Sequence, residues 1–256
     1  MTTAHAEHGH EAAHADHGHG DPAEHLAHHF DDKQQQFDSG KLGIWLFLVT
    51  EVLFFSGLFC AYTLFRAHRP EVFTAASKFL DTSLGAVNTV VLLFSSLTAA
   101  WAVRNAQLGQ KRGLIINILL TIACASTFMV VKYFEYTHKI HMGVVPGAGY
   151  APDAEAQRIL YGETGLQTSI QDAWSLEPSK PEVRNLHLFF SIYYGMTGLH
   201  GIHVVCGIIV WLWILRRAMA GEFGPKFFGP VDFTALYWHV VDIIWIYLFP
   251  LLYLIN

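Results

Sequence analysis

Charged residues are scarce in this sequence. Asp, Glu, Lys and Arg make up 14% of its 256 residues, whereas 52% of the residues are hydrophobic. Soluble domains carry about 25% charged residues, and here the charges are absent from several long runs. This composition excludes an ordinary soluble domain and indicates a membrane protein.

Cysteine is also rare. Cys60, Cys124 and Cys206 all fall within apolar runs at unrelated spacings. A disulfide framework or a thiolate metal site needs paired spacings, so we expect these side chains to be small buried hydrophobic groups. The net charge of −5 is modest. It gives no sign of a basic surface for nucleic acid, and we expect partners within the membrane instead.

We expect no cleavable signal peptide in the N-terminal segment, because residues 1–40 contain neither a basic start nor an apolar core. His, Ala, Gly and acidic residues dominate it, and nine of the 16 histidines of the chain lie here. Such a segment cannot bury enough apolar surface to offset its ordering entropy, so residues 1–40 are predicted to be a disordered tail. We expect no metal site in it, since a metal ion needs fixed ligand geometry.

Long apolar runs are abundant in the rest of the chain, residues 41–256. A helix rises about 1.5 Å per residue and the hydrocarbon core is about 30 Å thick, so a run of roughly 20 apolar residues predicts a transmembrane helix. We therefore predict an all-α, polytopic membrane helix bundle with an extracytoplasmic loop at 138–185. Its five spans are residues 42–65, 83–103, 114–137, 186–215 and 236–254.

The orientation of the spans follows from the short loops between them. The turn "RNAQLGQKRG" and the segment "RRAMAGEFGPK" are basic and lie on the same side as the N terminus. Short basic loops stay in the cytoplasm. The N terminus is therefore predicted to be cytoplasmic and the C terminus extracytoplasmic, although the loop "RAHRPEVFTAASK" on the other side is also basic.

A single carboxylate, Glu51, lies in the middle of the first span. As the tenth residue of that span it is expected roughly 15 Å from the helix start, near the bilayer midplane. A charged side chain is costly there and usually faces the bundle interior. We predict that Glu51 lies at a helix interface, bonded to a histidine of the fourth span or to buried water.

Other titratable residues also lie within spans. In the fourth span His200 and His203 share a face with Tyr193, and Gly195 and Gly198 on the opposite face are expected to allow close approach of a neighbouring helix. In the fifth span His239 and Asp242 are three residues apart, so we predict that they can bond to each other. Glu135 in the third span is a further candidate for a buried, proton-related site residue.

Three classes of function remain open from these residues alone, beside a purely structural role in which buried polar groups fix helix packing. Paired histidines on transmembrane helices are typical axial ligands in a haem-binding membrane cytochrome. A chain of Glu, His and Asp side chains is typical of a proton-coupled transporter. The third class comes from a family resemblance.

Five segments of the sequence are distinctive: "GKLGIWLFLVTEVLFFSGLF", "LGAVNTVVLLFSSLTAAWAV", "KYFEYTH", "GMTGLHGIHVVCGIIVWLWILRR" and "YWHVVDIIWIYLF". In their order and spacing they resemble subunit III of the haem-copper oxidases, the enzyme family to which cytochrome c oxidase belongs. Together they cover all five spans. The chain resembles the short bacterial form of this family, which lacks the first two helices.

The resemblance implies a non-redox subunit of a respiratory oxidase in the bacterial cytoplasmic membrane, docked on the catalytic subunit I. It implies no catalytic, cofactor-binding or metal-binding residues in this chain, with haem and copper in partner subunits and phospholipid bound in a cleft. Its roles would be lipid retention, oxygen access and support of proton uptake and turnover stability. Glu51 matches the family's intramembrane, carbodiimide-reactive glutamate. Related subunits of quinol oxidases and nitric-oxide reductase systems remain alternatives.

The chain departs from the family in the loop 138–185, which is far longer than the usual connection. Within it, "DAEAQRILYG" is predicted to form a short surface helix. A loop of this length often has a use. We expect it to dock a cytochrome c domain or another respiratory complex.

Overall fold

The computed structural model describes residue 30 and residues 32–146, 153–156, 158–159 and 186–255. Most of the predicted disordered tail and most of the long loop lie outside these residues. Within the loop, residues 154–156 and 158–159 are helical, in the segment predicted to form a surface helix. The Asp153 carboxylate accepts the Ala156 backbone N–H at 2.9 Å, as a helix N-cap does.

Helices dominate the described residues, and five of them are long and apolar enough to cross a membrane. The predicted all-α bundle of five transmembrane helices is confirmed. A sixth, short helix lies between the first two long ones. The elements are α1 (Lys33–His68), α2 (Pro70–Ser77), α3 (Thr82–Gln107), α4 (Lys111–His141), α6 (Leu186–Ala220) and α7 (Gly229–Tyr253).

Helix α1 begins before the predicted span. The Asp32 side chain caps it by accepting the Gln35 backbone N–H at 2.6 Å. Residues 33–40, which we expected in the disordered tail, are therefore helical. The span prediction missed them because it followed only the apolar run, whereas a capped helix continues through the polar residues at the membrane surface.

Helix α2 lies in a segment that was predicted to be a loop. Pro70 occupies its first turn, where a missing N–H costs nothing. Val72, Phe73 and Ala76 are buried, and the Phe73 ring packs edge-on against Phe189 of α6 at 5.3 Å between centroids. A helix of eight residues is too short to give a span signal, so only its tertiary contacts reveal it.

The connection between α3 and α4 is a tight turn around Gly109. Gly109 has φ +69°, and the Gln110 N–H donates to the Asn105 carbonyl at 2.8 Å. This is the hydrogen bond of a Schellman motif, which needs a residue in the left-handed region. The turn keeps α3 and α4 antiparallel and side by side.

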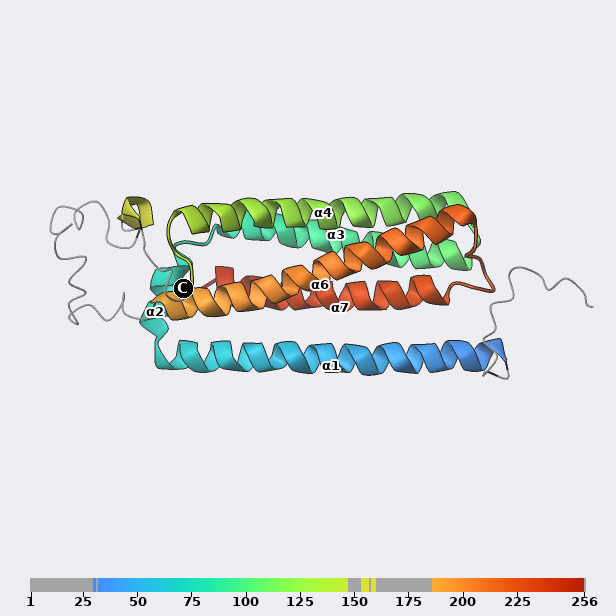
Figure 1. Cartoon of the computed structure of the whole chain (residues 1–256), viewed down its shortest axis with the longest axis horizontal. Helices are drawn as coiled ribbons and strands as arrows, with labels where there is room; N and C mark the ends of the chain where they lie inside the picture. Colours follow the sequence, from blue (N-terminus) through green and yellow to red (C-terminus); the bar gives the residue numbers. More distant parts are fainter. Residues whose placement is uncertain (1–29, 31, 147–152, 157, 160–185, 256) are drawn as a thin grey trace, which may run out of the picture.

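The long helices form a layered bundle in which α6 and α7 lie between α1 on one side and the pair α3 and α4 on the other (Figure 1). The C terminus lies at the α2 end, and the start of α1 lies at the opposite end. Helix α1 is the least enclosed. In its most apolar window 11% of the residues are buried, against 44% in α7.

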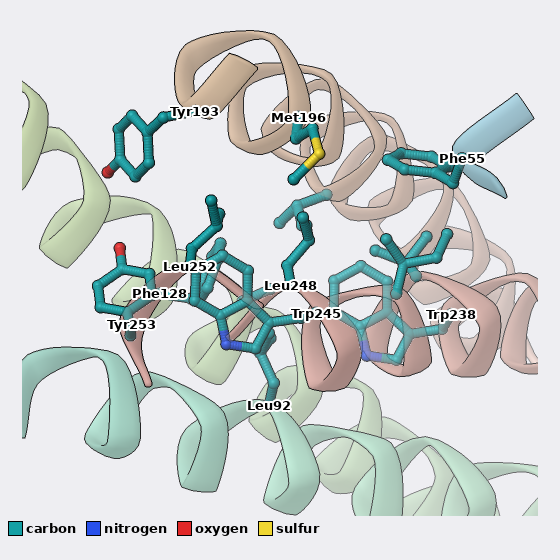
Figure 2. Close-up of a cluster of buried hydrophobic side chains, with 14 of the residues drawn as sticks. Phe55, Leu92, Phe128, Tyr193, Met196, Trp238, Trp245, Leu248, Leu252 and Tyr253 are labelled. Carbon is teal, nitrogen blue, oxygen red and sulfur yellow. The ribbon is translucent and has the colours of Figure 1, made fainter. Parts of the chain in front are cut away.

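The core is built from aromatic side chains between α4, α6 and α7. Trp238 and Trp245 project from α7 into it, and Phe128 of α4 packs edge-on against Trp245 at 4.8 Å (Figure 2). The indole N–H groups donate to α3: Trp238 to Ser95 at 2.9 Å and Trp245 to Thr89 at 3.1 Å. Buried tryptophans thus carry both the packing and the polar link between α3 and α7.

Two expectations about small residues were wrong. Cys60 and Cys206 are exposed rather than buried, although all three cysteines are free. Gly195 and Gly198 have open space where a side chain would lie, so no helix of the described chain packs closely on that face. These cysteines and glycines lie in apolar runs, and an apolar run covers both the inner face of a helix and the face that contacts the membrane. The sequence pattern therefore did not show which face they occupy.

Helix α3 packs closely against α7 at Gly85. A Cβ atom there would lie 2.8 Å from the Phe249 ring and 2.9 Å from the Tyr253 ring. Replacing Gly85 with Leu should therefore destabilise the bundle by about 1–3 kcal/mol, the usual cost of overpacking. Thermal unfolding in detergent, followed by circular dichroism, measures the effect. Gly43→Leu is the control, since nothing lies within 4 Å of its Cβ position, and equal melting temperatures would refute this view of the interface.

Candidate functional site: the buried polar groups of the bundle

Glu51 of α1 bonds to His203 of α6. The Glu51 Oε2 atom lies 2.9 Å from His203 Nε2, and the two side chains are 19% and 18% exposed. The contact confirms the predicted histidine partner in the fourth span. It also connects α1, the least enclosed helix, to the centre of the bundle.

The hydrogen bonds around His203 determine how many protons this pair holds. His203 Nδ1 lies 2.8 Å from the Leu199 carbonyl oxygen. A carbonyl only accepts, so Nδ1 carries a proton, and Nε2 and Glu51 share one further proton. The pair is either a neutral acid facing a neutral imidazole or a carboxylate facing an imidazolium.

Apolar and aromatic groups surround the pair. The Phe55 ring lies edge-on to the His203 ring at 5.3 Å between centroids, and the Tyr237 hydroxyl of α7 donates to the His203 carbonyl at 3.0 Å. Three helices therefore position one titratable pair. Its two side chains can share one proton across the contact between Glu51 Oε2 and His203 Nε2.

His200 does not belong to this pair, although the sequence placed both histidines on one face. It is 1% exposed, and its ring lies between Trp245 at 5.2 Å and Phe128 at 5.6 Å. Neither ring nitrogen has a hydrogen-bond partner among the described residues. Although the two histidines are only three residues apart on α6, their side chains lie in different environments. His203 faces α1, and His200 faces the core.

His239 and Asp242 do not satisfy each other, so that prediction was wrong. His239 Nδ1 lies 2.7 Å from the Ser96 hydroxyl of α3. Asp242 is 2% exposed, and neither of its oxygens makes a hydrogen bond among the described residues. The Ser96 hydroxyl and the Cys124 thiol lie near its carboxylate. His239 therefore bonds to Ser96 of the neighbouring helix α3, and not to Asp242 as the sequence pattern predicted.

Glu135 lies in a buried charge cluster near the end of α4. Its carboxylate pairs with Lys132 at 2.8 Å and with Lys139 at 2.5 Å. It also accepts the hydroxyl protons of Tyr193 of α6 at 2.8 Å and Tyr253 of α7 at 2.6 Å. The two hydroxyls point toward each other (Figure 2). The cluster, defined as Lys132, Glu135, Lys139, Tyr193 and Tyr253, joins three helices at one end of the bundle.

Sequence reasoning named Glu135 but missed both lysines of this cluster. Lys132 is 6% exposed and Lys139 is 1% exposed, which is rare for lysine. The signal was present in "KYFEYTHK", because residues three before and four after a carboxylate share its helix face. Lys132 also lies 5.0 Å from the Trp245 ring centroid, a cation–π contact that helps to hold an ammonium group away from water.

The described residues contain no group of three or more His, Cys, Asp or Glu side chains that could hold a metal ion. The polar groups are instead distributed as pairs and small clusters between helices. Their arrangement is suited to holding protons and fixing helix contacts.

A comparison with protein families matches this chain to cytochrome c oxidase subunit III over residues 25–143 and 185–256. The chain belongs to the cytochrome c oxidase subunit III family. Residues 144–184, between the two matched segments, lie outside the family pattern and fall within the long loop. The family assignment favours the oxidase subunit over the cytochrome and the transporter that the sequence left open.

Relatives of the subunit III family cover most of this chain. It is 28% identical over 215 residues to the probable cytochrome c oxidase subunit 3 of Nocardia farcinica, covering 84% of this chain and 87% of that protein. It is 29% identical over 238 residues to cytochrome c oxidase subunit 3 of Synechocystis sp., covering 91% and 81%. It is 25% identical over 255 residues to quinol oxidase subunit 3 of Bacillus subtilis, covering 98% and 97%.

Replacing Glu135 with Gln should destabilise the bundle strongly, because two buried ammonium groups then lose their shared counter-charge. Breaking a buried ion pair costs about 3–5 kcal/mol. The matched control is Glu222→Gln, which breaks the partly exposed pair with Arg217 at 2.6 Å and should cost about 0–1 kcal/mol. Detergent-induced unfolding followed by tryptophan fluorescence compares the two. Similar losses in both variants would show that the buried cluster does not hold the bundle together.

Proposed function

We propose that this chain is the non-redox subunit III of a cytochrome c oxidase in a bacterial cytoplasmic membrane. The match to the subunit III family over both halves of the membrane domain carries the proposal. In this role the chain docks on subunit I, and haem and copper reside in partner subunits. It contributes lipid retention, complex stability and support of proton uptake to the reduction of oxygen.

The open faces of the bundle support an assembled state. In all five long helices less than half of the most apolar window is buried within the chain. The remaining apolar surface needs lipid or other subunits to cover it. The proposed orientation keeps the N terminus cytoplasmic and the C terminus extracytoplasmic. The loop 138–185, most of which lies outside the described residues, would then face the side from which a cytochrome c domain or another respiratory complex docks.

A quinol oxidase is the second candidate. The relative from Bacillus subtilis carries the name quinol oxidase subunit 3 and covers 98% of this chain. In either proposal the electron donor binds elsewhere in the complex, and this chain has the same non-redox role.

Purification of the complex through this chain, in mild detergent, tests the proposal. We expect larger subunits to co-purify and the reduced-minus-oxidised spectrum of the complex to show haem. Once this chain is separated from those subunits, the fraction that contains it should show none. Oxygen consumption with reduced cytochrome c, and then with a quinol, assigns the donor. Haem retained by the isolated chain, or purification without any haem-bearing subunit, would overturn the proposal.

Glu51→Gln separates hydrogen bonding from proton exchange at the site. A Gln side-chain N–H can donate to His203 Nε2 in the tautomer required by Leu199, so the variant should assemble normally. It cannot exchange its proton, so the number of turnovers before inactivation should change if titration matters.

Glu51→Leu is the comparison variant, because it removes the hydrogen bond to His203 as well. It should weaken the attachment of α1 and lower the yield of assembled complex. Oxygen consumption followed to inactivation measures turnover lifetime. Equal assembly and equal lifetime in both variants and the parent protein would show that the pair has no role.

A further inference from the structure

Asp242 of α7 lies in the bundle interior without a hydrogen-bond partner. It is 2% exposed, and neither carboxyl oxygen makes a hydrogen bond among the described residues. Buried polar groups of native proteins are nearly always hydrogen-bonded, so an exception calls for an explanation. A titratable residue inside the membrane often marks a proton pathway. The groups around Asp242 therefore decide whether it can exchange a proton.

Two polar groups from neighbouring helices lie near the Asp242 carboxyl group. They are the Ser96 hydroxyl of α3 and the Cys124 thiol of α4. A thiol is a weak donor and a weak acceptor, whereas a hydroxyl donates one hydrogen bond and has two acceptor lone pairs. Ser96 is therefore the neighbour that can pass a proton to Asp242 or take one from it.

The same hydroxyl contacts His239, which lies three residues before Asp242 on α7. Ser96 Oγ is 2.7 Å from His239 Nδ1. Residues three apart on a helix share a face, and here both side chains lie beside one serine of α3. The direct bond between His239 and Asp242 that the sequence predicted does not form, but Ser96 is next to both groups.

His239 connects this group of residues to one end of the bundle. It is half-buried, whereas Asp242 is buried. Asp232 lies in the first turn of α7 and acts on His239 electrostatically. Seven residues of helix rise about 10 Å and make about two turns, so the two side chains share a face. Helix α7 starts at the end of the bundle where α1 starts (Figure 1).

A proton can move along the three groups with no redox change. When Asp242 holds the proton, its O–H can donate to Ser96 Oγ, and the Ser96 hydroxyl can donate to His239 Nδ1. A concerted shift breaks these two O–H bonds and forms a new O–H bond on Ser96 and an N–H bond on His239. Asp242 becomes a carboxylate and His239 an imidazolium, which can release its Nε2 proton. The reverse shift reloads Asp242.

We propose that Asp242, Ser96 and His239 form a proton relay. In this relay Asp242 stores a proton in the core and exchanges it with the α1 end of the bundle through Ser96 and His239. The relay is separate from the Glu51 and His203 pair, which lies between α1 and α6. It deepens the support of proton uptake proposed above and rests on that proposal only for its purpose in the complex, because all three residues belong to this chain.

Hydrogen–deuterium exchange of the Asp242 carboxyl group, followed by infrared spectroscopy, tests the relay. The sample is the full-length chain in nanodiscs, with carbon-13 in the side-chain carboxyl groups of its aspartates. We expect a C=O band of a protonated aspartate at neutral pH, which shifts when H₂O is replaced by D₂O and is absent from Asp242→Asn. A parent protein without this band, or a folded Asp242→Asn variant that retains it, would overturn the proposal.

Ser96→Ala removes the hydroxyl and should slow the exchange of this band about tenfold or more. Ser96→Thr keeps a hydroxyl and should exchange within about twofold of the parent rate. The matched control is Ser56→Ala, because the Ser56 hydroxyl is exposed and bonds only the Val52 carbonyl of its own helix. Equal rates in Ser96→Ala and the parent protein, or equal slowing in Ser56→Ala, would refute the relay.

His239→Gln is the second variant if Ser96→Ala fails to fold. A Gln side chain cannot take up a proton at one atom and release another from a second, so the exchange should slow as well. An unchanged rate in this variant would also refute the relay. The measurement uses this chain without its partners. Slow exchange in Ser96→Ala, in a protein that co-purifies with no haem-bearing subunit, would therefore count against the proposed function and not against the relay.

Discussion

Hydrocarbon offers a polar side chain no hydrogen-bond partner, and the bundle is arranged around this constraint. Several titratable residues inside the membrane domain bond to groups on other helices, and His200 lies against the rings of Phe128 and Trp245. Glu51 bonds to His203, and His239 bonds to Ser96. Glu135 forms ion pairs with two lysines and accepts hydrogen bonds from two tyrosines. The partners of Glu51 and His239, and the two tyrosines that bond Glu135, come from other helices, so these polar contacts help to determine which helices are neighbours. Apolar packing alone would discriminate little between them, since lipid is as apolar as leucine.

The two sides of the bundle are attached in different ways. Helices α3, α4, α6 and α7 share a core of tryptophans whose indole N–H groups also bond across helices. Helix α1 adds few buried residues and depends on the Glu51 contact and on Tyr62, whose hydroxyl bonds the Leu251 carbonyl near the end of α7. An arrangement of this kind leaves α1 the helix most easily displaced, and its outer face the one most available to lipid or another subunit.

Much of this architecture could be predicted from the sequence, because the thickness of the hydrocarbon core sets how many apolar residues a helix needs to span it. The five spans and the histidine partner of Glu51 followed from that physics. The pairing of His239 with Asp242 failed because spacing along one helix says nothing about a better partner, here Ser96, on another. Helix α2 and the buried lysines 132 and 139 were missed for a related reason: their burial comes from contacts between elements, not from local composition.

The partners Glu51 and His203 are separated by 152 positions in the chain. Synthesis at about 5–20 residues per second means that the two are made on the order of 10 s apart. During that interval α1 enters the bilayer with its acid unpaired. An uncharged carboxyl group tolerates this exposure far better than a carboxylate. Because α6 is made long after α1, the contact between Glu51 and His203 can form only after α6 has entered the membrane.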